Sequence, residues 1–457
     1  MSKTVALITM GCARNDVDSE ELAGRLAADG WKLVDDAADA EVAVINTCGF
    51  IESAKQDSIN SLLEAHALKG NGVTKAVVAV GCMAERYGEE LATALPEADG
   101  ILSFDDYKDI SARLGEILSG QKPAPHTPQD RRNLLPISPA ERKKETIDLN
   151  FARKRLNDAP WAPLKIASGC DRRCAFCAIP QFRGAFISRH PLEVIEEAKW
   201  LADNGVSEVF LVSENTTSYG KDLGDLRAME KLIPELSKID GIKRIRLSYL
   251  QPAEMRPTLL QAMIEDEKVA PYFDLSFQHS AKDVLRSMRR FGGNEEFLHL
   301  ISQIRALSPD AGIRSNFIVG FPGETEDEFE HLLQFVREAQ IDRAGCFAYS
   351  PVEGALANQL DHPVPDAIRE DRRARFMAKA EEISIQRLAR KVGKRIQVLI
   401  DRVDESGGIG RTVGDAPEID GLVRVLPPSK PSKRYRTGEI IRATVISSQG
   451  HDLIAET

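Results

Sequence analysis

The chain has 457 residues, enough for two to four domains of ordinary size. Hydrophobic residues make up 42% and charged residues 28%, a globular composition that excludes a disordered, collagen-like or coiled-coil chain. The net charge of −10 argues against a general nucleic-acid binder, although a local basic patch is compatible with it. An odd count of 7 cysteines in so long a chain argues against a secreted disulfide framework.

No run of the sequence approaches the roughly 18 apolar residues that cross a bilayer. Met1 to Met10 carries a lysine and a short apolar stretch, as a signal peptide does, but Arg14 and Asp16 follow without a small-residue cleavage site. We therefore expect no membrane association and a cytoplasmic protein whose first apolar run is a buried strand.

The first 118 residues alternate between strand-like and helix-like patterns. The apolar runs are 4–10, 41–46 and 75–80, and the helical stretches are 19–29 and 54–68. Such βαβ alternation predicts a parallel sheet, and strands this continuously apolar are typical of a sheet covered on both faces. We predict an N-terminal α/β domain over residues 3–118.

In this domain one cysteine follows each predicted strand. The three are Cys12, Cys48 and Cys82. Because parallel strands end at one edge of a sheet, their thiols should meet in the crevice beyond the carboxyl ends, where open α/β sheets bind ligands. Three thiolates can hold a [4Fe–4S] cluster, which needs four ligands, and leave one iron open. The alternative is three buried structural cysteines.

Residues 119–155 change character. Prolines punctuate the stretch 123–139, and arginines and lysines accompany them. Proline removes a backbone donor and fixes φ, so this density excludes a regular helix or a central strand. We predict a linker.

Strand and helix patterns resume over residues 156–388. The candidate strands are 164–168, 208–213, 244–250, 273–277, 312–319 and 342–349, with helices between them such as 191–204 and 326–339. Five or six βα units of this size predict a partial or complete (β/α) barrel.

The last part of the chain is predicted to be β-structure. A helix over 378–392 precedes short apolar runs separated by glycine and proline. These runs are 396–400, 421–425, 440–446 and 452–455. The pattern predicts a small β-barrel over residues 389–457.

Three further cysteines directly follow the first strand of the central domain, as Cys170-Asp-Arg-Arg-Cys174-Ala-Phe-Cys177. A loop this short can turn three thiolates toward one [4Fe–4S] cluster and again leave an iron open to an exogenous molecule. The alternative is a zinc site in which His190 supplies the fourth ligand.

The CxxxCxxC spacing, with Phe176 before its last cysteine, resembles the signature of radical S-adenosylmethionine (SAM) enzymes. The resemblance implies that the open iron binds SAM, and that one electron then cleaves it to a 5′-deoxyadenosyl radical. It also places the site at the carboxyl ends of the barrel strands.

Two segments match regions that contact SAM in such enzymes. Glu214 and Asn215 end a barrel strand and are expected at the methionine end, although Glu214 departs from the usual glutamine. Gly320 and Gly323 lie in Phe317–Glu324, which lines the SAM pocket in the family or is a plain turn; glycine there permits close backbone approach.

The whole arrangement resembles a narrower family, the methylthiotransferases. These join such an N-terminal domain to a radical SAM domain and a C-terminal TRAM β-barrel. The matching stretches include Cys12–Asn15, Asn46–Cys48, Gly81–Cys82, Phe317–Glu324 and Tyr349–Pro351. The resemblance implies two [4Fe–4S] clusters and two uses of SAM, to insert sulfur and a methyl group at an unactivated C–H bond. Both open irons must then face one substrate carbon in a water-free site.

Several other residues are compatible with either a functional or a structural role. Gln278 and His279 line the substrate mouth or are hydrogen-bonded structural residues. Cys346 is expected in the core. Five arginines are candidates for carboxylate or phosphate contacts, or for solvated and capping roles: Arg183, Arg189, Arg246, Arg289 and Arg290. The sequence assigns no catalytic side chain.

The resemblance leaves two substrates open, an adenosine of tRNA and the β-carbon of an aspartate in ribosomal small-subunit protein twelve. Residues 396–457 contain eight basic and nine acidic residues, whereas RNA binding needs a basic excess on one face. The stretch 410–421 also resembles the ribosomal-protein branch.

We therefore predict the ribosomal-protein substrate. RNA contact is secondary, through the cluster Lys430, Lys433, Arg434 and Arg436. A third hypothesis is a non-enzymatic iron–sulfur or RNA-binding scaffold. The electron donor, the sulfur donor and the oligomeric state are not determined by the sequence.

Overall fold

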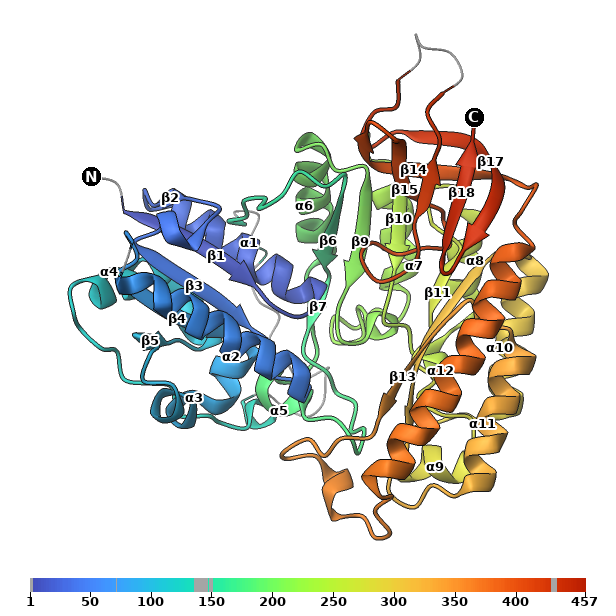
Figure 1. Cartoon of the computed structure of the whole chain (residues 1–457), viewed down its shortest axis with the longest axis horizontal. Helices are drawn as coiled ribbons and strands as arrows, with labels where there is room; N and C mark the ends of the chain where they lie inside the picture. The colour runs from blue at the N-terminus through green and yellow to red at the C-terminus, as the bar shows by residue number, and fades with distance from the viewer. Residues whose placement is uncertain (1–2, 71, 135–146, 148–150, 429–433) are drawn as a thin grey trace. The chain divides into compact units, whose positions relative to one another are not determined.

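The computed structural model describes residues 3–70, 72–134, 147, 151–428 and 434–457 (Figure 1). The chain groups into two compact units. The first comprises Met1–Asp158, Ser168–Arg172 and Ala178–Ile187, and the second Ala159–Ala167, Arg173–Cys177 and Ser188–Thr457. The domain boundaries predicted from the sequence stay predictions.

A five-stranded parallel sheet forms the centre of the first unit, in the order β2-β1-β3-β4-β5. Its strands are β1 Thr4–Thr9, β2 Lys32–Leu33, β3 Val42–Thr47, β4 Ala76–Gly81 and β5 Gly100–Ile101. The helices around it are α1 Ala13–Ala28, α2 Glu52–Ala67, α3 Cys82–Ala94 and α4 Ile110–Leu118. The predicted parallel α/β domain is confirmed.

Successive side chains of the strands pack on opposite faces of this sheet. Val42 and Val44 of β3 belong to the core under α1 and α4, whereas Ala43 and Ile45 belong to the core under α2 and α3. Because both faces are covered, side chains on both faces of β3 are apolar from Val42 to Ile45, and the strand forms a continuous apolar run in the sequence.

The described part of the predicted linker lies against the first unit. Over 119–134 it contains one short 3₁₀ turn, η4 Arg131–Asn133. The Arg131 guanidinium donates to the buried carboxylate of Glu85 at 2.8 Å, and the backbone carbonyl of His126 accepts from the N–H of Glu89 at 3.1 Å. Glu85 and Glu89 both belong to α3, so these hydrogen bonds attach the segment to the helix that begins at Cys82.

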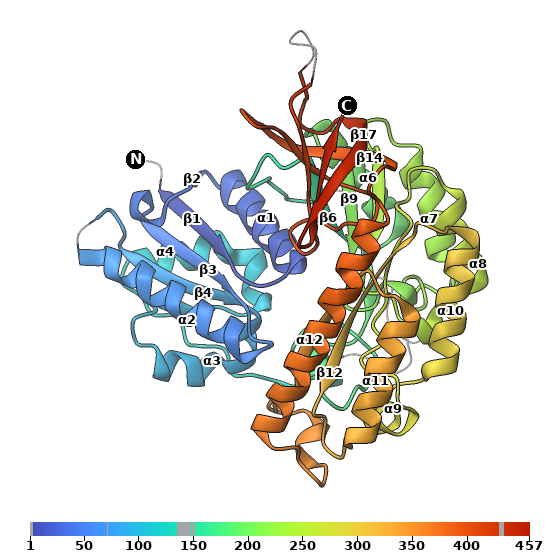
Figure 2. The ribbon, with the colours of Figure 1, turned by 45° about the vertical axis from the view of Figure 1, so that its right-hand side comes forward.

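Six parallel strands form a partial barrel in the second unit (Figure 2). They are β6 Trp161–Lys165, β9 Glu208–Val212, β10 Arg244–Leu247, β11 Tyr272–Asp274, β12 Gly312–Val319 and β13 Arg343–Ala348. The two three-stranded halves are joined by parallel bridges from Ile245 to Val269 and from Leu250 to Leu275. The predicted (β/α) partial barrel is confirmed.

The helices of this barrel pack on the strands through one large apolar core. They are α6 Pro191–Asp203, α7 Ala228–Ser237, α8 Pro257–Glu265, α10 Asn294–Leu307 and α11 Glu326–Ala339. Two short helices, α5 Ile179–Arg183 in the first unit and α9 Lys282–Ser287 in the second, carry residues of the candidate sites.

The long helix α12 Asp366–Ala389 begins well before the predicted start at residue 378. Its first half is dominated by charged residues, so the helical apolar pattern is faint there. Tertiary contacts stabilise that half instead, because Arg372 is buried and donates to Glu324 at 2.9 Å.

A closed five-stranded β-barrel ends the chain, in the order β14-β15-β16-β18-β17. Its strands are β14 Arg395–Asp404, β15 Gly407–Arg411, β16 Val423–Val425, β17 Ile440–Gln449 and β18 Asp452–Glu456. Strand β15 was not predicted, since it is rich in glycine. Glycine is needed there: a Cβ at Gly410 would lie 2.0 Å from the carbonyl oxygen of Leu399.

Within the described ranges, no helix combines the length and the hydropathy required to cross a bilayer.

Candidate functional site

Polar side chains tie together the carboxyl ends of three strands in the first unit. Asn15, in the first turn of α1, is fully buried and donates to the backbone carbonyl of Met10 at 2.8 Å and to that of Thr47 at 3.3 Å. The Thr47 hydroxyl donates in turn to the carbonyl of Val80 at 2.5 Å. The ends of β1, β3 and β4 are therefore held in a fixed relation at this edge.

The structure brings Cys12, Cys48 and Cys82 to this edge. Cys12 precedes α1 and Cys82 is the first residue of α3. Cys48 follows β3, and a Cβ added to Gly11 would lie only 3.0 Å from its Sγ. The Sγ of Cys82 lies 3.7 Å from Asn15 Oδ1. The predicted convergence is observed, while the role of these thiols as ligands stays a prediction.

The electrostatics of the three thiols are coupled. Burial raises the pKa of Cys12, but Arg14 and Arg183 outweigh it and lower that pKa below its ordinary value. Burial raises the pKa of Cys48, and it raises the pKa of Cys82 to about 11. The charge of Cys12 contributes to both increases, so Cys12 interacts electrostatically with each of the other two thiols.

Three thiols are a donor set that suits an iron–sulfur cluster. Among the residues that the structure describes, no three His, Cys, Asp or Glu side chains are grouped so that they could hold a metal ion. Soft thiolates are also the ligands that such clusters select, and a coordinating thiol loses its proton outright, whatever its pKa in the free chain.

Cys82 follows a glycine that no other residue can replace without strain. Gly81 has φ +90°, and a Cβ there would lie 2.2 Å from Asn46 Oδ1 and 2.7 Å from the Thr47 carbonyl oxygen. We expect Gly81→Ala to lower the free energy of unfolding by roughly 2–4 kcal/mol, since backbone strain and overpacking add. Denaturant unfolding and iron content after reconstitution measure the effect.

Gly30→Ala is the matched control for this prediction. Gly30 has a similar φ of +84°, but nothing lies within 4 Å of the added Cβ. Only the strain of about 1–2 kcal/mol should remain, with iron uptake unchanged. Equal losses for the two variants would show that contact with the strand ends is unimportant.

Cys170 belongs to the first compact unit. Its N–H donates to the carbonyl of Gly184 at 3.1 Å, and its Sγ accepts from the N–H of Arg172 at 3.4 Å. Gly169, with φ +78°, allows the backbone to approach Ala185, where a Cβ would lie 2.1 Å from the carbonyl oxygen. These contacts hold the start of the cysteine loop against the segment that follows α5's last residue.

Cys174 and Cys177 belong to the second compact unit. The N–H of Cys177 donates to the carbonyl of Cys174 at 3.2 Å, which makes a tight turn. The N–H of Ala175 donates to the carbonyl of Met288 at 3.0 Å, and the Arg290 guanidinium donates to Cys174 Sγ at 3.5 Å. Residues after α9 therefore support the loop that carries two of the predicted ligands.

His190, the fourth ligand of the zinc alternative, has one of its two ring nitrogens engaged. Its Nδ1 accepts from the N–H of Leu192 at 3.3 Å and caps α6.

The glycines predicted to line the SAM pocket lie in a turn that requires positive φ, which glycine adopts without strain. Gly320 and Gly323 have φ +69° and +86°. The carboxylate of Glu324 accepts from the N–H of Gly320 at 2.8 Å and from that of Phe321 at 3.3 Å, and Arg372 donates to it. The buried Glu324 thus shapes this turn, a contribution that the sequence analysis did not assign.

Phe176 packs in the same region. It is partly buried against an apolar cluster that includes Ala175, Phe321 and Tyr349. The aromatic side chain of the cysteine loop therefore contacts residues next to the predicted SAM turn.

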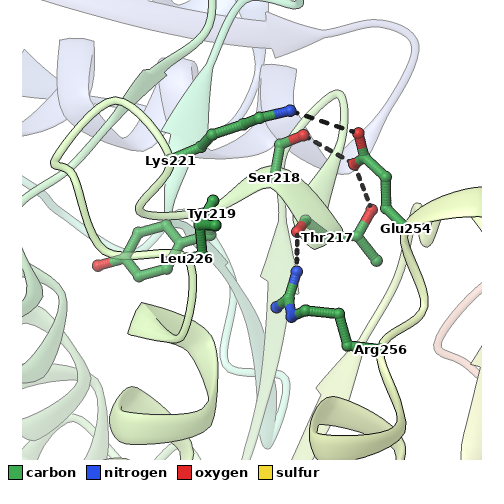
Figure 3. Close-up of a pocket in the computed structure, with 7 residues that line it drawn as sticks. All are labelled: Thr217, Ser218, Tyr219, Lys221, Leu226, Glu254 and Arg256. Atoms are coloured by element: carbon green, nitrogen blue, oxygen red, sulfur yellow. Dashed lines mark hydrogen bonds and ion pairs between the residues drawn. The ribbon is translucent and has the colours of Figure 1, made fainter. Parts of the chain in front are cut away.

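Asn215 organises the turn after β9, whereas Glu214 lies half-buried beside it. The Asn215 side chain donates to Ser218 at 2.8 Å and to Glu254 at 3.1 Å, and it accepts from Thr217 at 2.6 Å. An open pocket of about 130 Å³ adjoins these residues (Figure 3). Its lining consists of Thr217, Ser218, Tyr219, Lys221, Leu226, Glu254 and Arg256.

Four other candidates make contacts inside the protein core or in buried ion pairs. His279 is fully buried, its Nδ1 accepts from the N–H of Ala281 at 3.0 Å, and burial lowers its pKa to about 3. Arg189 and Arg246 form ion pairs inside the second unit, with Glu197 and Glu208. Cys346 is buried in the core, as predicted.

Comparison with known proteins agrees with this architecture. Residues 4–103 match uncharacterized protein family UPF0004, residues 164–336 the radical SAM superfamily and residues 392–457 the TRAM domain. Among solved structures, the radical SAM methyltransferase TsrM from Kitasatospora setae has a TM-score of 0.54 at 14% identity, over 76% of this chain and 75% of that one. This likeness concerns the fold.

The three regions in this order define a radical SAM enzyme with a TRAM barrel. Two relatives are named ribosomal protein uS12 methylthiotransferase RimO. The Streptomyces avermitilis protein is 55% identical over 99% of this chain and 96% of its own length, and the Kineococcus radiotolerans protein is 54% identical over 100% and 97%. The chain belongs to this RimO family of methylthiotransferases. The enzyme class predicted from the sequence is confirmed, against the scaffold hypothesis.

Proposed function

We propose that this enzyme adds a methylthio group to the β-carbon of an aspartate in ribosomal protein uS12. The observation that carries the proposal is the identity of 55% over 99% of the chain with a protein named for that substrate. The near-neutral composition of the C-terminal barrel supports it, since an RNA-binding barrel needs a basic face. Two of the four basic residues considered for RNA contact, Lys430 and Lys433, lie outside the described residues.

The six clustered cysteines hold the cofactors in this proposal. Cys12, Cys48 and Cys82 bind one [4Fe–4S] cluster, and Cys170, Cys174 and Cys177 bind the other. SAM contacts Phe176, Glu214, Asn215, Gly320 and Gly323. When bound, these groups supply the hydrogen-abstracting radical, the sulfur and the methyl group.

The side chains around the cysteines prepare them for this role. Asn15 and Thr47 fix the strand ends, so that three thiols meet without ordering cost when a cluster binds. Arg14 and Arg183 favour the thiolate of Cys12. Glu324 fixes the shape of the Gly320 turn by accepting two backbone N–H groups.

The substrate also places the enzyme. A protein that modifies a ribosomal protein works in the cytoplasm, where ribosomes are assembled and function.

The mass of uS12 tests the proposed substrate. After deletion of the gene, uS12 should be lighter by about 46 mass units, with tRNA modifications unchanged. Expression of this chain should restore the mass, and peptide fragmentation should locate it on one aspartate. If uS12 keeps its mass and a methylthioadenosine disappears from tRNA, the substrate is tRNA instead.

A further inference from the structure

In each predicted cysteine triad, the guanidinium of an arginine donates a hydrogen bond to one of the sulfurs. Arg183 Nη2 lies 3.1 Å from Cys82 Sγ, and Arg290 Nη1 lies 3.5 Å from Cys174 Sγ. Each contact lies within a single unit of the structure. We propose that Arg183 and Arg290 are positioning residues that raise the reduction potentials of the two clusters, one each. This inference rests on the proposed function.

Buried contacts within the first unit hold the side chain of Arg183 in place. Its side chain is 7% exposed and is held by the carboxylate of Asp18 at 3.2 Å, which is equally buried. The same nitrogen donates to Asn15 Oδ1 at 2.9 Å, and the guanidinium lies over the Phe104 ring at 5.0 Å. A carboxylate, an amide and an aromatic face therefore fix the donor beside Cys82 before any cluster binds.

Arg290 is fixed by backbone groups in the second unit. The Nη2 atom of Arg290 donates to the carbonyl of Ser276. The backbone N–H of Arg290 donates to the carbonyl of Leu285 at 2.8 Å. Two residues earlier, Met288 accepts from the N–H of Ala175. The segment that carries the guanidinium is thus attached to the cysteine loop through its backbone as well.

The physical effect on a cluster has a defined sign. An oxidised [4Fe–4S] cluster with three thiolates is anionic, and reduction adds a further negative charge. A charge-assisted hydrogen bond to a ligating sulfur stabilises the reduced state more than the oxidised state. Hydrogen bonds to the sulfurs and local charge are established determinants of cluster potential. Removing either arginine should therefore lower the potential of its own cluster.

The test is an anaerobic redox titration of the full-length chain, reconstituted with iron and sulfide and followed by electron paramagnetic resonance. Arg183→Gln is measured with Cys170, Cys174 and Cys177 replaced by alanine, so that only the N-terminal cluster contributes. Arg290→Gln is measured with the other triad replaced. At a fixed poise, each should lower the ratio of reduced to oxidised cluster about tenfold, which is ~59 mV for a one-electron couple.

Three further variants sharpen the result. Asp18→Asn removes the carboxylate beside Arg183 and should raise the potential of the N-terminal cluster, the opposite sign. Arg183→Lys and Arg290→Lys keep the charge and should recover part of the shift. Arg113→Gln and Arg286→Gln are matched controls, because both arginines are surface residues paired with carboxylates, and neither should change a potential.

Each outcome decides the proposal. Unchanged potentials in the glutamine variants with fully assembled clusters would overturn it, as would equal shifts in the surface controls. If a glutamine variant fails to bind iron, the lysine variant is measured instead, and a potential no lower than that of the wild type would overturn the proposal for that site. Failure of the wild-type chain to assemble either cluster would instead refute the proposed function.

Discussion

Replacing Cys12, Cys48 and Cys82 together by alanine is expected to abolish methylthio transfer while leaving the cleavage of SAM to 5′-deoxyadenosine intact. The iron content should fall from about eight to about four atoms per chain. The reason is that Cys12, Cys48 and Cys82 follow strand ends at one sheet edge of the first unit, whereas the CxxxCxxC loop is predicted to hold the other cluster. Iron analysis, 5′-deoxyadenosine release and the mass of uS12 give three independent readouts.

The controls separate loss of a cluster from loss of the fold. Replacing Cys170, Cys174 and Cys177 should abolish both reactions, because SAM cleavage depends on that loop. Cys346→Ala also removes a buried cysteine but no predicted ligand, so both reactions should persist. Retention of methylthio transfer in the first triple variant would refute the role of the N-terminal edge.

Glu208→Ala is expected to lower the free energy of unfolding of the second unit by about 3–5 kcal/mol, the usual cost of leaving buried charges uncompensated. Glu208 is fully buried on β9. Its Oε1 accepts from Arg246 at 2.8 Å, and its Oε2 lies 2.9 Å from Arg411 and 3.7 Å from Arg244. Without the carboxylate, three buried arginines face one another. Denaturant unfolding measures the loss, with Glu235→Ala at an exposed ion pair as the control.

The same cluster predicts a pH dependence. Burial by itself raises the pKa of Glu208, but Arg411, Arg246 and Arg244 outweigh it and lower the pKa from 4.5 to about 2. Since the folded pKa is depressed, the stabilisation is fully present above pH 4.5 and is lost as the pH falls toward 2. The wild-type chain should lose stability over this window more steeply than Glu208→Gln. Parallel pH profiles would contradict the assignment.

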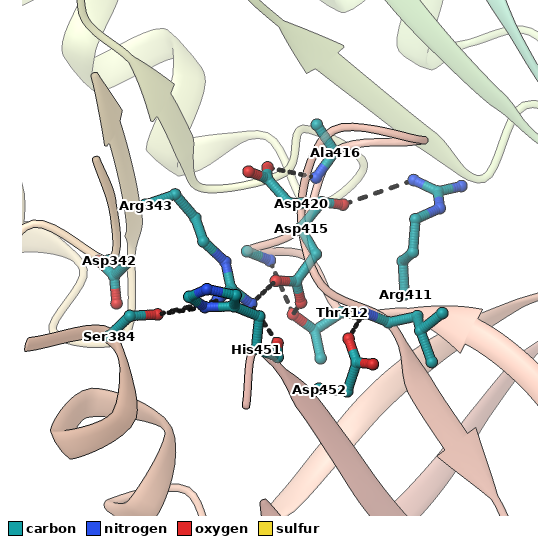
Figure 4. Close-up of polar contacts among 12 residues, drawn as sticks. Asp342, Arg343, Ser384, Arg411, Thr412, Asp415, Ala416, Asp420, His451 and Asp452 are labelled. Atoms are coloured by element: carbon teal, nitrogen blue, oxygen red, sulfur yellow. Dashed lines mark hydrogen bonds and ion pairs between the residues drawn. The ribbon is translucent and has the colours of Figure 1, made fainter. Parts of the chain in front are cut away.

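Arg411 lies on β15, so this ion-pair cluster also joins the C-terminal barrel to the strands of the (β/α) barrel. The loop that follows makes a second set of contacts (Figure 4). Asp415 accepts from Arg343 of β13 at 2.9 Å, and the hydroxyl of Tyr272 donates to Asp420 at 2.7 Å. Arg246 donates to the carbonyl of Val413 at 3.0 Å. Within the second unit, the TRAM barrel is therefore fixed to the (β/α) barrel by buried polar contacts.

The sequence alone predicted the features that depend on local pattern. Continuous apolar runs predicted the parallel strands, and the position of one cysteine after each of three strands predicted that Cys12, Cys48 and Cys82 meet, because parallel strands end together. The same reasoning failed for β15 and for the start of α12. Glycines in a closed barrel and a charged helical half are specified by what packs against them, which a local pattern does not contain.

What only the tertiary structure decided is the environment of the cysteines. The guanidinium of Arg183 donates to Cys82, which lies 101 residues earlier in the chain. No sequence pattern near either residue predicts this pairing. The same holds for Arg290 and Cys174, and for Glu208 and Arg411. The number and spacing of the predicted cysteine ligands can be read directly from the sequence. The charged residues around them cannot, because folding brings together side chains that are far apart in the sequence.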